Sequence, residues 1–435
     1  MKKILAFCIV FCLFSKGNSQ VLTLEQAVKM GLDNSKALKV SVAKSEIASE
    51  KLSQFKASTL PSVNASAGYT RLSDLTPPTL TFPGLGTFSL FPIFVNNYAT
   101  RVAVYEPIFA GFRARHTLES SQFLEKAAQL DYEKDKEEAV INIISAYYNL
   151  YKLNISKKLL EQNAEQVKHH LTDIQNMGQQ GLATTNDVLK AQLQLDNIQL
   201  GKLDMENAYA VALFNFNIMI GQDNKSFQLD SAAMFRSNPL NTYESYLQKA
   251  LAERPDIKAA DYRTKTGDAN IKIAKGAYYP LVAVAGNYYV SNPNPRIIPP
   301  EQRWVNTWDA GISLNWDLMG LYTNKHKVVE ALTVQKQNQA MYDLSIDQAK
   351  MEVNQNFITN QESVQKINVA QNTIKQAEEN YRVMQNRFNE RVATVTDLLD
   401  ANIILLQAKM NLETAKADAE VSYYKLIKST GTLKF

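Results

Sequence analysis

Two aspartates near the end of the chain, Asp397 and Asp400, have a type and spacing that could place two negative charges together. They lie three residues apart, so on a helix both carboxylates project from one face. Such carboxylates attract cations and repel anions. Asp397 also has a structural interpretation, because Thr394 stands three residues before it and the pair fits a helix capping box. Capping and ion attraction are compatible, and Asp400 lies beyond the box.

The turn that carries these acids occurs twice in the chain. Residues 181–195 read GLATTNDVLKAQLQL, and residues 391–405 repeat the pattern 210 positions later as RVATVTDLLDANIIL. Where the second copy has Asp400, the first has Lys190. A constant offset over long segments predicts duplication of one large unit built from long helices. The pairs related by this offset are Ala183/Ala393, Thr184/Thr394, Asp187/Asp397, Leu189/Leu399, Ala191/Ala401, Leu195/Leu405, His116/His326 and Gly221/Gly431.

The duplication sets the expected organisation of the chain. Residues 20–225 form the first structural repeat, 226–240 a linker and 241–435 the second repeat. Residues 1–19 have the features of a secretory signal peptide, with lysines, a short apolar run and a small-residue cleavage site. Cys8 and Cys12 both lie in the apolar run, and each follows a phenylalanine rather than the small residue usual before a lipidated cysteine. The mature chain would contain no cysteine, which excludes disulfides and zinc–thiolate sites.

Charge and motif content argue against several function classes. Loss of the signal peptide removes three lysines and leaves 44 basic residues against 43 acidic ones, a balance unlike that of nucleic-acid binders. No Ser-His-Asp grouping, Walker loop or GxGxxG motif is visible. His169 and His170 are adjacent, so on a helix they cannot form an i, i+4 metal pair. We therefore expect no catalytic residues, no cofactor and no metal.

Long helices must position the two turns. All 13 prolines fall within 61–107, 239–255 and 280–300, and interior proline costs about 3 kcal/mol in a helix. The proline-free zones predict long helices over about 113–177 and 322–388, each followed by a short break and a returning helix. The second returning helix has a heptad, four of whose five positions are leucine, and small residues follow three positions later, which indicates close helix packing: Leu398, Leu405, Leu412, Ala419 and Leu426, with Ala401, Ala408, Ala415 and Ser422.

The proline-containing zones predict strands instead. Apolar and polar residues alternate in 61–71 and 306–317, and more weakly in 98–107 and 281–291. Each segment has about the ten residues that a tilted membrane strand needs. Aromatic residues cluster near the last two strands and suit a membrane-interface girdle, although a soluble β-sandwich core is the alternative. The girdle candidates are Trp304, Trp308, Trp316, Tyr278 and Tyr279.

Four strands cannot close a barrel, and open strand edges are not tolerated in lipid. The chain must therefore oligomerise if it lies in a membrane. Two copies supply eight strands, whose interior side chains would fill, and three copies supply twelve. A conduit favours the larger number.

Nearly the whole mature chain resembles the TolC family of outer-membrane efflux and secretion channels. The resemblance is carried by LTLEQA at 22–27, LPSVNASAGY at 60–69, YEPIFAG at 105–111 and the doubled Ala-Thr-x-x-Asp-x-Leu-x-Ala turn. It implies a mixed α/β membrane protein, in which four β-strands per protomer contribute to a 12-stranded trimeric barrel above a long α-helical coiled-coil periplasmic barrel. It also implies a passive homotrimeric exit duct of a tripartite efflux or type I secretion system, in the outer membrane of a Gram-negative-type bacterium. Its partners would be outer-membrane lipid, a periplasmic adaptor and an inner-membrane pump.

In that family the doubled turn forms the periplasmic tip where the tunnel narrows. The resemblance implies that Asp397, Asp400 and Asp187 are constriction candidates. In a trimer Asp397 and Asp400 would form two stacked rings of three carboxylates, where close packing of like charges should raise some pKa values. Some members use an arginine just before these acids to hold the tip closed. Here Ala393 stands at about that place, so a latch must use other groups, and the candidates are Arg387 and Arg391. The tip turns themselves comprise Gly181, Ala183, Thr184, Ala393 and Thr394.

Two other functions compete with the channel. A non-channel periplasmic coiled-coil adaptor or scaffold would share the long helices, but the strand pairs and aromatic clusters disfavour it. A surface hydrolase would need a catalytic constellation that the sequence does not contain.

Overall fold

A computed structural model of the chain describes residues 21–223, 225–229 and 241–435. The predicted signal peptide and most of the predicted linker lie outside these residues. The described residues form two compact units. One takes 21–42, 346–435 and, apart from the gaps named above, 131–256; the other takes 43–130 and 257–345. Each unit therefore draws on both halves of the chain, and the boundaries of the two sequence repeats stay a prediction.

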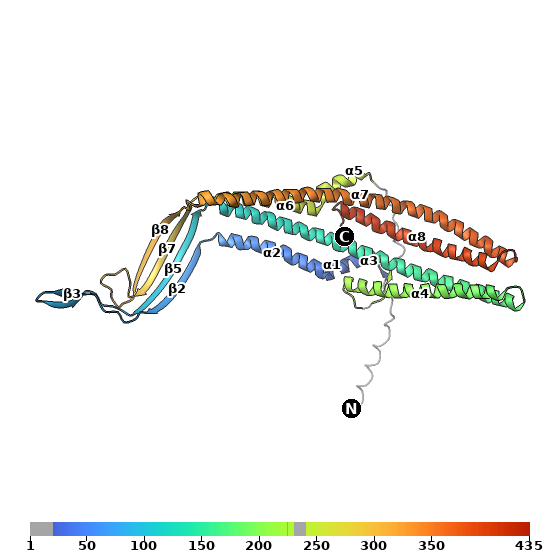
Figure 1. Cartoon of the computed structure of the whole chain (residues 1–435), viewed down its shortest axis with the longest axis horizontal. Coiled ribbons are helices and arrows are strands. Elements are labelled where there is room, and N and C mark those ends of the chain that lie inside the picture. The colour runs from blue at the N-terminus through green and yellow to red at the C-terminus, as the bar shows by residue number, and fades with distance from the viewer. Residues whose placement is uncertain (1–20, 224, 230–240) are drawn as a thin grey trace, which may run out of the picture. The chain divides into compact units, whose positions relative to one another are not determined.

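The second unit contains a four-stranded antiparallel sheet in the order β2-β5-β7-β8 (Figure 1). The strands are β2 (Ser62–Arg71), β5 (Asn96–Phe109), β7 (Leu281–Asn292) and β8 (Val305–Asn315). All four predicted strands are confirmed. The alternation in sequence becomes two faces, because directly paired residues share a face. One row across the sheet runs Ala65–Val102–Tyr288–Trp308, and the next row, on the other face, runs Ser66–Arg101–Tyr289–Thr307.

The first connection of the sheet contains a second hairpin. The composition of residues 73–96, rich in proline, glycine and threonine, is typical of a long surface loop, and within this loop β3 (Thr79–Phe82) pairs with β4 (Gly86–Ser89). Gly84 and Gly86 at its turn have φ of 86° and 92°, a backbone conformation that favours glycine. The glycines of this segment allow a tight turn, and the prolines do not prevent the antiparallel pairing of β3 with β4.

The long predicted helices are confirmed. They are α3 (Arg113–Gln179) and α7 (Gly320–Asn389), which return through α4 (Thr185–Ile220) and α8 (Val395–Ser429). No described helix combines the length and apolar character that a bilayer crossing requires. The remaining helices and strands are β1 (Val21–Leu22), α1 (Leu24–Asn34), α2 (Lys36–Ser58), β6 (Gln228–Leu229), α5 (Tyr243–Glu253) and α6 (Pro255–Gly276).

The core of the first unit lies where the two helical hairpins meet. One buried cluster draws on α3, α4, α7 and α8, with Val167, Ala191 and Leu398 fully or almost fully enclosed. The five heptad positions predicted in α8, and three of the four small residues three positions after them, are buried. Burial of this seam contributes apolar stabilisation to the hairpins.

Candidate functional site

The first tip turn ends α3 with a left-handed residue. Gly181 has a φ of 73°, its N–H donates to the carbonyl of Gly178 at 3.0 Å, and the N–H of Leu182 donates to the carbonyl of Met177 at 2.8 Å. These two bonds define a Schellman motif, which satisfies carbonyls at the end of the helix. A Cβ at Gly181 would meet nothing within 4 Å, so only its backbone angle favours glycine here.

The second tip turn repeats this geometry with arginine in place of glycine. Arg391 has a φ of 62°, its N–H donates to the carbonyl of Phe388 at 2.9 Å, and the N–H of Val392 donates to the carbonyl of Arg387 at 2.7 Å. An L-residue with a side chain pays about 1–2 kcal/mol for the left-handed conformation. The strain of Arg391 is local to the turn that connects α7 to α8.

Both turns then start their returning helices with a capping box. Thr184 Oγ1 accepts from the N–H of Asp187 at 3.2 Å, and Asp187 Oδ2 accepts from the N–H of Thr184 at 2.9 Å. Thr394 and Asp397 form the same pair of bonds at the same distances. The capping interpretation is confirmed for both acids.

The caps also set the charge of these acids. Hydrogen bonds from the side chain and backbone of Thr184 lower the pKa of Asp187, and those of Thr394 lower the pKa of Asp397. The positive charge of Arg387 adds to the effect at Asp397. In one chain both carboxylates are therefore ionised at neutral pH. The raised pKa values expected from stacked rings require three chains and stay a prediction.

Asp400 and its counterpart Lys190 differ in their surroundings. Asp400 is exposed and belongs to no cap. Lys190 Nζ donates to Thr396 Oγ1 at 3.0 Å and so connects the start of α4 to the start of α8. Sequence analysis identified Lys190 only as a difference between the copies. The contact needs the two hairpins to lie side by side, which the repeat pattern does not specify.

The other tip candidates have simpler roles in the structure. Ala183 and Ala393 are partly buried and pack against the cluster between the hairpins. Arg387 and Arg391 are exposed, and within the described residues neither takes part in an ion pair. Their role as latches stays a prediction.

A buried polar contact that sequence reasoning missed lies between the hairpins. His170 Nε2 lies 2.8 Å from the hydroxyl oxygen of Tyr381, which also accepts from Gln166. Burial lowers the pKa of His170, so the ring is neutral at pH 7. Asn163 and Asn402, both buried, share a hydrogen bond of 2.8 Å between their side-chain amides. Helical periodicity places these residues on a seam but does not identify their partners.

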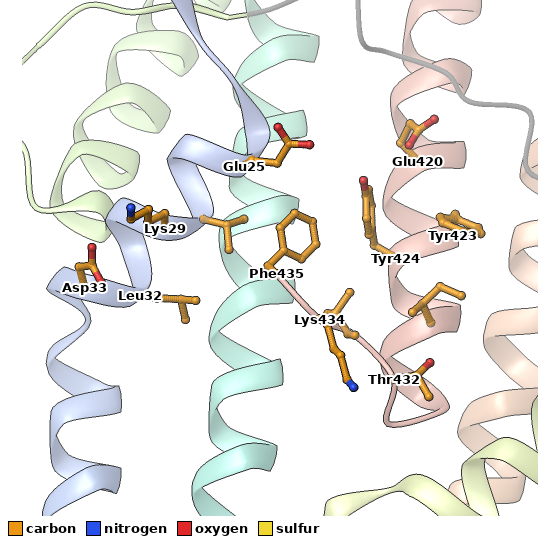
Figure 2. Close-up of a pocket in the computed structure, with 13 residues that line it drawn as sticks. Glu25, Lys29, Leu32, Asp33, Glu420, Tyr423, Tyr424, Thr432, Lys434 and Phe435 are labelled. Carbon is orange, nitrogen blue, oxygen red and sulfur yellow. The ribbon is translucent and has the colours of Figure 1, made fainter.

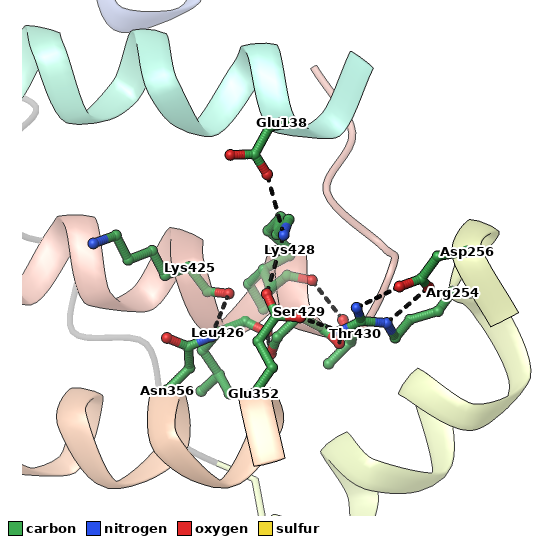
Figure 3. A network of polar contacts seen from close by, with 11 residues as sticks. Glu138, Arg254, Asp256, Glu352, Asn356, Lys425, Leu426, Lys428, Ser429 and Thr430 are labelled. Carbon is green, nitrogen blue, oxygen red and sulfur yellow. Dashed lines mark hydrogen bonds and ion pairs between the residues drawn. The ribbon is translucent and has the colours of Figure 1, made fainter. Parts of the chain in front are cut away.

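A charged network, shown in Figure 3, joins the end of α8 to the start of α6. The Arg254 guanidinium donates to Asp256 at 2.7 Å, to Glu352 at 2.6 Å and to the carbonyl of Ser429 at 3.1 Å. Lys428 completes the network through Glu352 at 3.0 Å. At the corresponding joint of the first half a neutral amide makes the contact: Asn34 donates to the carbonyl of Ile220 at 3.1 Å. The network was not predicted.

A pocket of about 860 Å³ lies beside α1 (Figure 2). Residues of α1, α8 and the end of the chain line it, and the ring of Phe435 lies 5.7 Å from that of Tyr424. Its charged residues include Lys29 and Asp33. No group of His, Cys, Asp and Glu within the described residues is arranged to hold a metal.

Four of the five girdle candidates lie at the two ends of the sheet. At one end Trp316 lies one residue beyond β8 and donates from Nε1 to the carbonyl of Tyr278 at 3.1 Å. Tyr279 follows Tyr278 in the sequence. At the other end the ring of Trp304 lies 5.6 Å from that of Tyr98. Trp308, between the ends, is 73% exposed. The strand predicted over 306–317 ends two residues earlier in the structure, at Asn315. An interface role for the five aromatic residues stays a prediction.

Comparison with known proteins identifies the architecture. The model of a family described as "Outer membrane efflux protein" matches residues 27–222 and 246–432. The chain belongs to this outer membrane efflux protein family. It is 21% identical to the outer membrane protein TolC of Vibrio cholerae over 322 residues, 73% of each protein.

Solved structures agree on the fold. The CmeC outer membrane channel of Campylobacter jejuni superimposes with a TM-score of 0.80 at 18% identity, covering 94% of this chain and 85% of CmeC. VceC of Vibrio cholerae gives a TM-score of 0.76 at 17% identity, covering 94% and 96%. The predicted family, function class and location are confirmed: this member of the efflux family is an outer-membrane channel protein of efflux or secretion systems that extends into the periplasm.

Proposed function

We propose that three copies of this chain form a passive exit duct with a closed twelve-stranded barrel. The observation that carries the proposal is the open sheet: β2 and β8 are its edge strands, and each has a partner on one side only. Unpaired strand edges are not tolerated in lipid. Pairing of β8 with β2 of the next copy satisfies both edges at once, and three copies enclose a lumen wide enough to conduct.

The two faces of the sheet support a membrane setting. Ile312, Leu314 and Val63 belong to the apolar face and are each at least 66% exposed in the single chain. Such a face suits lipid, while the polar face suits a water-filled lumen. The aromatic groups at both ends of the strands suit the two membrane interfaces.

An exposed stripe on α4 supports assembly of the helices. Seven large apolar residues of α4 are each at least 55% exposed, and they are spaced three, four, seven or eight positions apart, so they share one helix face. The opposite face of α4 is already buried within the chain, and it includes Ala191, Leu195 and Ile198. A second copy of this chain would cover the stripe, which comprises Leu189, Leu193, Leu200, Leu203, Val211, Phe214 and Ile218.

In this assembly the tip turns form the constriction. Three copies would supply rings of Asp397, Asp400 and Asp187, with Lys190 reducing the negative charge of alternate hairpins. The duct would carry out no chemistry on its cargo and would need no cofactor. An inner-membrane pump, joined through a periplasmic adaptor, would drive export. The non-channel adaptor interpretation does not explain a four-stranded sheet with an apolar exposed face.

Purified full-length protein tests this proposal. Native mass spectrometry in detergent should give a trimer, and the trimer should conduct ions across a planar bilayer with a preference for cations. Trivalent hexamminecobalt should block the current from one side. A stable monomer without conductance would overturn the proposal.

A further inference from the structure

The polar face of the sheet holds a compact charged cluster. Of the residues on this face of the four strands, all of which the structure describes, only Arg101 and Asp309 are charged. Arg296, from the connection between β7 and β8, forms an ion pair with Asp309. Two arginines and one aspartate leave the cluster with net positive charge.

Arg101 is held in place by neutral groups. Its Nε and Nη2 donate to Asn287 Oδ1 at 3.0 and 2.7 Å, and its guanidinium carbon lies 5.7 Å from the centre of the Tyr289 ring. The Asn287 amide is oriented by its own bond to Asp309 Oδ1 at 2.6 Å. Asn287 uses only part of the guanidinium fork, since arginine carries five N–H donors. Within residues 21–223, 225–229 and 241–435, Arg101 therefore forms no ion pair with a carboxylate.

Arg296 is fixed near the same ring. Its guanidinium carbon lies 4.5 Å from the centre of the Tyr289 ring. Asn294 is only 2% exposed. Its side-chain oxygen accepts from the backbone N–H of Arg296 at 2.9 Å, and its side-chain N–H donates to the carbonyl of Val305 at 3.1 Å. Two guanidinium groups are therefore preorganised around one aromatic ring, and both are exposed. Guanidinium forks match the oxygens of phosphate and carboxylate groups.

We propose that Arg101 and Arg296 form a binding site for multivalent oxyanions, such as phosphate- or carboxylate-bearing solutes, on the lumen side of the barrel. This inference rests on the proposed trimeric duct, in which the polar face lines the lumen and the site occurs three times. The site would concentrate anionic solutes at the sheet, whereas the carboxylates of the tip turns attract cations. A cargo molecule with separated charges of both signs would be attracted both by the arginines of the sheet and by the carboxylates of the tip turns.

Arg101→Gln removes the charge while keeping polar contact with Asn287. Arg71→Gln is the matched control, because Arg71 lies on β2 of the same sheet but on the alternate face from Ser66. Inorganic pyrophosphate is added to each side of a bilayer containing full-length trimers. Pyrophosphate on one side should block the current through wild type and through Arg71→Gln. For Arg101→Gln the same degree of block should need about tenfold more pyrophosphate, as expected for the loss of one charge-assisted hydrogen bond. Arg101→Lys should recover part of the block.

The outcomes separate this site from the duct itself. Equal block of Arg101→Gln and wild type, or conducting wild type without pyrophosphate block, overturns the oxyanion site and leaves the duct standing. Absence of conductance in wild type overturns the duct. If Arg101→Gln does not form trimers, Arg296→Gln makes the same test, because it removes the second guanidinium and leaves Asp309.

Discussion

The ammonium group of Lys190 donates a hydrogen bond to the hydroxyl of Thr396 across 3.0 Å, and this contact joins the start of α4 to the start of α8. It is the one place at the tip turns where the two hairpins are linked by a described polar side-chain contact. The linkage uses a residue that differs between the copies, since the position of Lys190 in the second copy holds Asp400. The break in repeat symmetry therefore coincides with the contact between the hairpins.

Lys190→Met should loosen this linkage without unfolding the chain. An exposed hydrogen bond of this kind contributes about 0.5–1 kcal/mol, so its loss should shift a closed–open equilibrium by about two- to fivefold. Resting conductance in planar bilayers should rise by that factor. Lys168→Met, an exposed lysine on α3, is the control. Unchanged resting conductance in Lys190→Met would show that the contact does not hold the hairpins together.

Asp400→Asn and Thr394→Ala should separate ion attraction from capping. Asp400 is outside the cap, so Asp400→Asn should reduce cation selectivity and weaken block by hexamminecobalt while the thermal unfolding temperature stays the same. Thr394→Ala removes the cap hydroxyl and should cost about 1 kcal/mol of stability. Paired conductance and circular dichroism measurements check both. Unaltered selectivity and block after replacing Asp397 and Asp400 together by Asn would refute the carboxylate rings.

Arg391→Gly should stabilise the second turn. Glycine removes the steric cost of φ 62° without disturbing the two Schellman hydrogen bonds, which are made by the backbone. We expect a gain of about 1 kcal/mol in denaturant unfolding. Gly181→Ala provides the reverse test, because it introduces the same strain at φ 73° in open space. If Arg391→Gly also raises resting conductance, the side chain of Arg391 acts as a latch in addition.

His170 should make the packing of the hairpins sensitive to acid. Its pKa is lowered from 6.5 in the folded chain, so below pH 6.5 the unfolded chain binds more protons than the folded one. The contribution of His170 to stability is therefore present above pH 6.5 and is lost as the pH falls below it. Thermal unfolding monitored from pH 8 to 5 should show a smaller decline in His170→Gln than in wild type. His169→Gln, which alters the exposed neighbour, should decline like wild type.

Leu200→Glu should prevent assembly while leaving the single chain folded. Leu200 is 61% exposed in one chain, so a carboxylate there is solvated, but trimer formation would bury it among apolar residues. Native mass spectrometry should show monomers with unchanged helical content by circular dichroism. Gln199→Glu adds the same charge one position away from the stripe and should still give trimers. Trimers of Leu200→Glu would mean that the stripe is not the interface.

Local patterns in the sequence determined the elements of this protein. Alternation in residues 61–71 and 281–291 predicted strands because successive side chains of a strand point to opposite faces. Thr184 and Asp187, and their repeats, predicted helix starts because a capping box needs only residues three positions apart. The absence of proline from 108–238 and 301–435 predicted the long helices, and the order of short motifs predicted the family.

Only the tertiary structure decided the contacts between distant segments. Lys190 meets Thr396 and Arg254 meets Glu352 because separate helices pack side by side, and periodicity fixes the face of a helix but not its neighbour. The hairpin within 73–96 depends on pairing in a segment whose composition is that of a loop. Arg101 and Asn287 lie 186 positions apart in sequence, and the register of β5 on β7 brings them together. Sequence spacing describes neighbours along the chain, whereas these sites are made by neighbours in space.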